Sequence, residues 1–295
     1  MFLINVFWMW LAFLFFLALG LVVARHKLAT EATIDKLITL GPIFAGSSVA
    51  MFGAEHLTSA QVIAQGVPSY IPGHLFWTYF VGFALIATGV SLCLRQCMSL
   101  SSLLTGAMIF MFVLMLHVPR VIANPHDRFA WAVVLRDSAF AAGFMAFGAA
   151  QLERPGKWMM MVGRIVFGVA IVVFAAEHFL HPASAPGVPL EKITPAWFPL
   201  PALWSYLTGV VLLLGGICLL INRYAREGAA SVGVVEAWIT FFLYTPILIA
   251  SIHLNAQAPE LIEGLNYVGD TLLFAGAALF VAAASPAREV KVRAA

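Results

Sequence analysis

Charged residues are scarce in this chain: Asp, Glu, Lys and Arg make up 10% of its 295 residues, against roughly 25% in a soluble domain. The formal net charge is only +2, and no basic run suggests a nucleic-acid partner. In contrast, 62% of the residues are hydrophobic and the mean hydropathy is +0.95. This is more apolar surface than a water-soluble fold of this size can bury, so we expect a lipid bilayer around much of the chain.

Cysteines are also few. Cys93, Cys97 and Cys218 are an odd number without paired spacing, which excludes a disulfide framework. Cys93 and Cys97 lie one helical turn apart, but membrane helices commonly carry cysteine as a small hydrophobic residue. The chain has no Cys-x-x-Cys-His sequence and no paired histidines with ligand spacing on one helix. We therefore expect no metal or haem site.

The first segment, residues 1–24, lacks the basic start and the small-residue cleavage site of a signal peptide. We interpret it as a retained transmembrane helix. Its many aromatic residues are typical of a lipid-facing helix with an interfacial Trp anchor. A surface against a partner subunit or a pigment is the alternative.

Long apolar runs dominate the rest of the sequence, and each is near the roughly 20 residues that a helix needs to cross a bilayer. Pro and Gly separate them. The sequence predicts an all-α membrane protein with about nine transmembrane helices, the last eight over residues 37–58, 74–95, 99–118, 130–150, 159–180, 202–222, 232–252 and 267–284.

Basic residues fall on alternate connections between these runs, while the opposite connections hold only Arg120, Arg128 and Lys192. By the positive-inside rule, the N-terminus lies outside and the C-terminus in the cytoplasm. A bacterial-type plasma membrane is the expected location. The basic set is Arg25, Lys27, Lys36, Arg95, Arg154, Lys157, Arg164, Arg223, Arg226, Arg288, Lys291 and Arg293.

An internal repeat is the most informative feature. Residues 41–61 and 163–183 share glycines, a phenylalanine and the triplet Ala-Glu-His. The pattern Trp-x-Tyr-x-x-Gly follows in both halves. The matched pairs are Gly46 with Gly168, Phe52 with Phe174, Glu55 with Glu177, Trp77 with Trp204, Tyr79 with Tyr206, Gly82 with Gly209, Gly89 with Gly216, Asp137 with Asp270, and Gly143 with Gly276.

The repeat divides the chain into a leading helix with its connection (1–36), a first four-helix unit (37–150) and a second four-helix unit with a tail (151–295). Since four is even, both units have the same orientation, related by a pseudo-two-fold axis along the membrane normal. We expect two four-helix bundles side by side, with glycines allowing close helix packing.

Ionisable side chains inside a membrane are costly and are candidates for function. Counting about 1.5 Å per residue from the basic flanks places them in the outer half of the bilayer and leaves the cytoplasmic half almost purely apolar. The candidate cluster for a ligand or for ion pairs is Glu55, His56, His117, Arg120, Arg136, Asp137, Glu177, His178, His253 and Asp270.

Two interpretations of this cluster stay open. Each Glu can neutralise Arg120 or Arg136 and so tie the bundle together, or it can orient a His, accept a proton or bind a ligand. Four aromatic residues near the outer helix ends, Trp77, Tyr79, Trp204 and Tyr206, suit interfacial anchoring. They also suit the wall of a pocket for a flat ring such as a quinone.

The connection from His181 to Pro201 contains six prolines, so we expect a stiff, extended loop. It is either a cap over the outer face or a plain connection.

The four-helix unit resembles the DoxX-like membrane proteins. The resemblance rests on the Gly-started first helix ending in an acidic residue (Glu55, Glu177) and on the spaced glycines of the second helix (Gly82, Gly89; Gly209, Gly216). It covers about residues 37–150 and 159–284. Members are usually single units, and some are small subunits of quinone-linked respiratory complexes or assembly factors. No catalytic residue is implied.

From this resemblance we expect a non-catalytic accessory subunit of a membrane electron-transfer complex, with subunits of that complex as partners. The alternatives are a protein that binds quinone or another small molecule in the outer half, and a transporter built from parallel repeats. Against the transporter, we find no pair of Pro- or Gly-broken helices near the midplane.

Overall fold

A computed structural model describes residues 2–188, 192–254 and 256–286. Within these ranges nine helices are long and apolar enough to cross a membrane, which confirms the predicted all-α membrane fold. They are α1 (Phe2–Thr30), α2 (Thr33–Thr58), α4 (His74–Leu94), α5–α6 (Met98–Phe112 and Val118–Ala123), α7 (Arg128–Ala150), α8 (Lys157–Leu180), α9 (Pro201–Leu220), α10–α11 (Ala225–Ile239 and Thr245–His253) and α12 (Ala258–Ala284).

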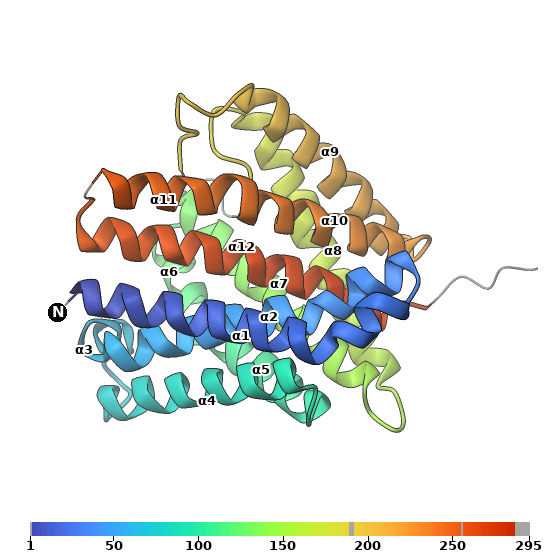
Figure 1. The fold of residues 1–295 in the computed structure, drawn as a ribbon, viewed down its shortest axis with the longest axis horizontal. Helices are drawn as coiled ribbons and strands as arrows, with labels where there is room; N and C mark the ends of the chain where they lie inside the picture. Colours follow the sequence, from blue (N-terminus) through green and yellow to red (C-terminus); the bar gives the residue numbers. More distant parts are fainter. Residues whose placement is uncertain (1, 189–191, 255, 287–295) are drawn as a thin grey trace, which may run out of the picture.

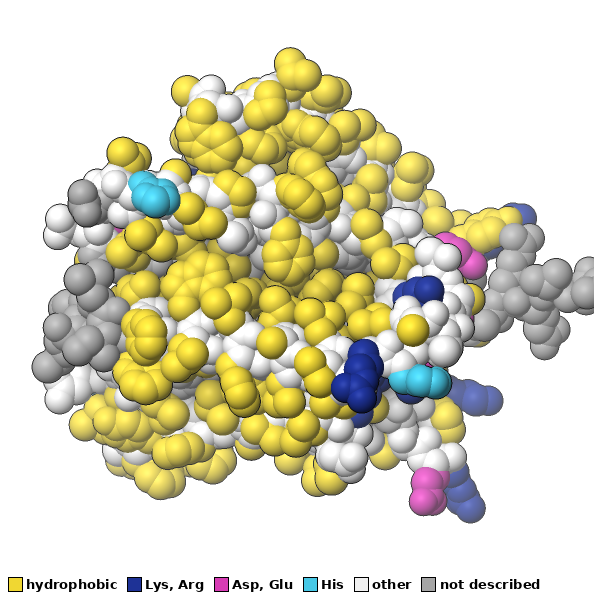
Figure 2. Space-filling view, viewed as in Figure 1, with side chains coloured by type: hydrophobic (Ala, Val, Ile, Leu, Met, Phe, Trp, Pro, Cys, Tyr) yellow, Lys and Arg dark blue, Asp and Glu magenta, His cyan; other side chains and the backbone are white. Residues whose placement is uncertain are grey.

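The helices run lengthwise through the molecule, and the face in view is largely apolar (Figures 1 and 2). Basic residues lie in or within a few residues of the connections after α1, α4, α7 and α9, and we call this side the basic end. The other side, with the start of α1 and the connections after α2, α6, α8 and α11, is the loop end. The basic residues Arg288, Lys291 and Arg293 lie outside the described residues.

Helix ends follow local chemistry. Asp127 caps α7 because its side chain accepts a hydrogen bond from Ala130 N at 3.1 Å. At the basic end, Arg95 and Cys97 adopt positive φ values of 57° and 53°, which turns the chain sharply between α4 and α5. Gly73, with φ of 74°, makes the corresponding sharp entry into α4 at the loop end.

The third helix of each unit contains a π-helical turn at the same place. These turns span Val113–His117 and Thr240–Tyr244, and each starts 36 residues after the repeated Trp (113 − 77 and 240 − 204). Pro119 and Pro246 lie two residues after the ends of these turns, and a proline removes a backbone donor from the helix. Both third helices are therefore interrupted, in their loop-end half and not at the midplane, to which the expectation from the sequence referred.

The two units interlock. Within each unit the first helix packs on the second and the third on the fourth, but α2 also packs along α12 and α8 along α7. The two fourth helices, α7 and α12, pack on each other at the centre. Each unit's first helix thus lies against the other unit's last helix. The interface between the two units is therefore more extensive than that of two separate bundles lying side by side.

The leading helix α1 lies along α2 and also contacts α4 and α12. Its Met9 and Phe13 are buried, and Gly20 allows close approach, since a Cβ there would lie 2.9 Å from Ile43. No other described helix takes the equivalent place against α8. The core itself is centred on α12, whose aromatic residues stack with those of α7 and α8, as in the pair Phe147–Phe280 at 4.1 Å between ring centroids.

Candidate functional site

An ion-pair clamp joins the two units near the loop end. Arg136 on α7 donates from Nε to Asp137 at 2.9 Å and from Nη1 to Asp270 on α12 at 2.6 Å. The two carboxylates are repeat equivalents, so one arginine serves both halves of the pseudo-symmetric structure. Its guanidinium also lies over the Phe140 ring. The structure thus brings together three of the predicted site residues.

The π-helical turn of unit 1 carries His117 into the same cluster. Nε2 of His117 lies 2.9 Å from Oδ2 of Asp137, opposite the oxygen that Arg136 contacts. An extra residue in a helical turn redirects the side chains that follow, and such turns are frequent at functional sites. The residue at the equivalent position in unit 2 is Tyr244, which stacks on Tyr267 instead.

Glu55 lies at the edge of this clamp. Its Oε1 accepts a hydrogen bond from Asn266 Nδ2 at 3.3 Å, and Asn266 lies one turn before Asp270 on α12. In the described part of the chain Glu55 forms no ion pair. The expectation that Glu55 neutralises Arg120 or Arg136 was wrong, because Arg136 is taken by the two aspartates.

Glu177, the equivalent of Glu55, has a different partner. It pairs with Arg128 Nε at 3.0 Å and lies 3.8 Å from His181. The predicted partners Arg120 and Arg136 were wrong here too. Arg128 begins α7, which runs antiparallel to α8, so it lies level with the end of α8, whereas Arg136 is two turns deeper.

Three of the predicted residues lie apart from the clamp. Arg120 pairs loosely with Asp127, at 3.8 Å, and lies over the Phe129 ring. His253 is exposed at the end of α11. His56 donates from Nδ1 to the Phe52 carbonyl oxygen at 2.8 Å, which is a contact within its own helix.

His178 holds a loop inside the bundle. Its Nδ1 donates to the Phe174 carbonyl oxygen at 2.7 Å, and its Nε2 accepts from Gly187 N at 3.2 Å, which fixes a neutral tautomer. Gly187 belongs to a buried stretch, Ser184–Val188, which we call the plug loop. The expected cap is therefore an inserted segment. Pro189, in the same predicted loop, lies outside the described residues.

The four aromatic candidates do not gather. Trp77, Tyr79 and Tyr206 are each more than 40% exposed, as interfacial anchors are. Trp77 donates to the Pro72 carbonyl oxygen, and Tyr206 stacks on Phe179. Trp204 instead stacks on Trp238 of α10, with ring centroids 4.6 Å apart.

A groove of about 410 Å³ lies at the basic end, away from the predicted site. It opens between the start of α2, the middle of α9 and the start of α10, and Ile34, Val211 and Val234 are among its mostly apolar lining. The ion pair between Arg226 and Asp35 joins α10 to α2 beside it. Trp77, Tyr79, Trp204 and Tyr206 do not line this groove.

Sequence reasoning missed one buried acid. Glu236, in the last turn of α10, is 0% exposed, and neither carboxylate oxygen has a hydrogen-bond partner in the described part of the chain. The expectation of an almost purely apolar cytoplasmic half overlooked it. Glu236 is the only acid within the predicted run 232–252. A single acid in an apolar run is visible in the sequence and could have identified Glu236 as a candidate.

The arrangement can hold charge, bridge the two units and exchange protons among carboxylates and a histidine. Within the described residues, no group of three or more His, Cys, Asp or Glu side chains is placed to hold a metal ion. Comparison with protein families, with curated proteins and with solved structures finds no match to this chain. The fold and the site therefore define an integral membrane protein, with nine apolar helices of membrane-spanning length in the described part of the chain and a charged clamp between its repeats.

Proposed function

We propose that this chain is a non-catalytic, DoxX-like accessory subunit of a membrane electron-transfer complex. The observation that carries the proposal is the Arg136 clamp. Its guanidinium is shared between Asp137 and Asp270, so these polar residues bind one another across the unit boundary. Paired charges of this kind are far less costly in a membrane than lone ones, and they fix how helices assemble.

The outer face of α1 is the surface we propose for the partner subunits. Phe7, Trp8, Leu14 and Phe15 are each about half exposed on it. Aromatic residues are enriched in protein interfaces because they offer large contact areas at low entropic cost. In this proposal the N-terminus lies outside a bacterial-type plasma membrane, and the basic end faces the cytoplasm.

Purification from native membranes in a mild detergent tests this, with mass spectrometry of the recovered subunits. We expect redox subunits in fixed stoichiometry, and we expect their loss from the triple variant Phe7→Ala, Trp8→Ala, Phe15→Ala. The matched control changes exposed apolar residues of α8, with Ile165→Ala and Val169→Ala, and keeps the complex. Recovery of the native chain alone would contradict the proposal.

A second candidate function rests on Glu55. This acid accepts one hydrogen bond from Asn266, and among the four acids of the cluster it alone forms no ion pair within the described chain. Its carboxylate is therefore the one among them that is left to bind a polar ligand group. A quinone or another small molecule with a hydrogen-bonding oxygen fits that chemistry. Quinone that copurifies with the isolated chain and is lost on Glu55→Gln, but not on Glu177→Gln, would favour this function over the first.

A further inference from the structure

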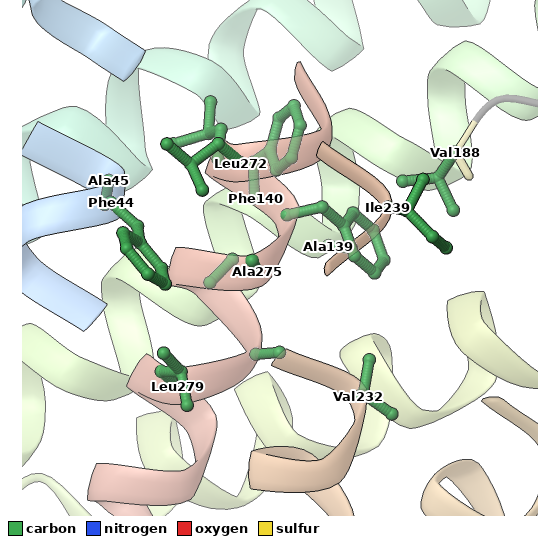
Figure 3. Close-up of a cluster of buried hydrophobic side chains, with 14 of the residues drawn as sticks. Phe44, Ala45, Ala139, Phe140, Val188, Val232, Ile239, Leu272, Ala275 and Leu279 are labelled. Carbon is green, nitrogen blue, oxygen red and sulfur yellow. The ribbon is translucent and has the colours of Figure 1, made fainter. Parts of the chain in front are cut away.

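Glu236 lies in the middle of a buried apolar face of α10. Val232, Glu236, Ile239 and Leu243 follow the helical spacing i, i+4, i+7 and i+11, and each is at most 1% exposed. Figure 3 shows Val232 and Ile239 along this helix, with Glu236 falling between them in sequence. The carboxyl therefore points into the packed interior of unit 2 and not toward lipid or water.

No charged group in the described chain balances this carboxyl. The helices packed on α10 are α9, α12 and, less closely, α2. The titratable residues of α9 are Tyr206 and Cys218. The acids of α12 and α2 nearest the core are Asp270 and Glu55. Asp270 accepts a hydrogen bond from Arg136, and Glu55 accepts one from Asn266. An unpaired carboxylate is very costly in an apolar interior, whereas the neutral acid is much less so.

The fold does not need an acid at this place. Glu236 lies 32 residues after Trp204, and the residue 32 after Trp77 is Ile109, which is buried in unit 1. An isoleucine thus fills the equivalent position in the same kind of helix. Replacing buried ionisable groups by apolar ones is often neutral or stabilising, so packing gives no reason for the carboxyl of Glu236.

The plug loop closes this interior toward the loop end. Val188 of this loop and Ile239, which follows Glu236 by one helical turn, belong to the same buried hydrophobic cluster (Figure 3). Gly187 lies against Tyr244, where an added Cβ would come within 2.9 Å of the ring, and its φ of 141° suits glycine. The hydrogen bond from Gly187 N to His178 holds the loop in place.

We propose that Glu236 is a proton-binding site buried within the bilayer and closed toward the loop end by the plug loop. Its ligand is the proton. The carboxylate takes up one H⁺ to become the neutral acid, and it releases the same proton when water reaches it. This site is separate from the Arg136 clamp and does not depend on the accessory function proposed above.

Labelling with dicyclohexylcarbodiimide, a lipid-soluble reagent, tests the proposal on the full chain in membranes. It reacts with protonated carboxyls: the acid proton moves to a carbodiimide nitrogen, the carboxyl oxygen adds to the central carbon, and the acyl group then shifts to nitrogen. At about pH 7, where an exposed Glu with a pKa of about 4.3 is ionised, we expect mass spectrometry to find Glu236 labelled. A water-soluble carbodiimide should leave it unlabelled.

Three variants make the result decisive. Glu236→Gln should lose the labelled peptide, and Glu236→Ile, which copies Ile109, gives a second test if the first variant folds poorly. Glu227→Gln, one acid nearer the basic end, should keep the label. Gly187→Ala should displace the plug loop and let the water-soluble reagent reach Glu236. Absence of lipid-soluble labelling in the native chain would overturn the proton site, and an unchanged pattern in Gly187→Ala would overturn the closure by the plug loop.

Discussion

Ile43 of α2 and Ile165 of α8 occupy equivalent positions in the two repeat units, yet 1% of the first side chain and 39% of the second is exposed. The difference comes from α1, which lies along α2 and has no counterpart on α8. A duplicated sequence therefore produced two helices of similar length, 26 and 24 residues, in different surroundings, one inside protein and one at the lipid boundary.

The residues around these isoleucines follow that difference. On α2 the next positions of the same face are Ser47 and Ala50, which are small and fully buried. On α8 the equivalents are Val169 and Val172, and Val169 is 45% exposed. Small residues allow close helix approach in membranes, while branched aliphatic ones suit contact with lipid tails. The exposed face of α8 is thus built for lipid.

The fourth helices differ in charge. One copy carries a charged residue at a position where the other copy has none. Arg136 of α7 corresponds to Gly269 of α12, where an added Cβ would clash with the end of the Met51 side chain. An arginine at position 269 would have to displace the end of the Met51 side chain. That single cation lies between two equivalent aspartates, so the stability of the contact between α7 and α12 depends on it.

The largest expected difference in stability is between the variants Arg136→Leu and Arg128→Leu. The first change leaves Asp137 and Asp270 together in a largely buried place, which costs about 3–5 kcal/mol of unfolding free energy. The second removes an ion pair whose arginine is 42% exposed, and such pairs contribute up to about 1 kcal/mol. Thermal unfolding in detergent, with yield from the membrane fraction, measures both.

Adding Asp270→Asn to Arg136→Leu serves as the control, because it removes one of the two unbalanced charges. We expect partial recovery of stability. Equal losses for the two arginine variants would show that the clamp is no more important than a surface pair.

Much of this fold could be predicted from the sequence because the apolar runs and their Pro and Gly boundaries are local signals. The pairing of Glu177 with Arg128 could not be predicted in this way. It depends on the antiparallel contact of α7 with α8, which crosses the boundary between units. A repeat identifies equivalent residues within units, but it does not say which helices of different units pack together.

The candidate site was predicted in part. Arg136, Asp137, Asp270 and His117 do meet, and counting residues placed them all in the outer half of the bilayer. The π-helical turn that directs His117 could not be predicted, because it depends on a one-residue change of hydrogen bonding within an apolar run. The plug loop could not be predicted either, since its burial rests on a contact with His178.

An intermediate difference in stability is expected when isoleucine is replaced by alanine at the equivalent positions 43 and 165. Ile43→Ala opens a cavity between α1 and α2 and should cost about 2 kcal/mol, at the low end for buried isoleucine. Ile165→Ala should cost much less, since lipid tails fill the space. Thermal unfolding of the two variants in the same detergent or lipid gives the difference. Equal costs would mean that α8 is covered as α2 is, which would place a partner helix on α8.

The smallest effect is expected from His178→Leu compared with His56→Leu. Both histidines donate to a carbonyl of their own helix, but only His178 also accepts a hydrogen bond, from the buried Gly187 amide. Leucine at position 178 leaves that amide without an acceptor, at a cost of about 1 kcal/mol or slightly more, while at position 56 no partner is lost from another segment. Since the lost bond fastens the plug loop, hydrogen exchange of the Gly187 amide should rise sharply in His178→Leu and stay unchanged in His56→Leu. Unchanged exchange in both variants would mean that packing of Ala185 and Val188 alone keeps the loop inside unit 2. His178 would then have no role in holding the loop, just as His56 has none in unit 1.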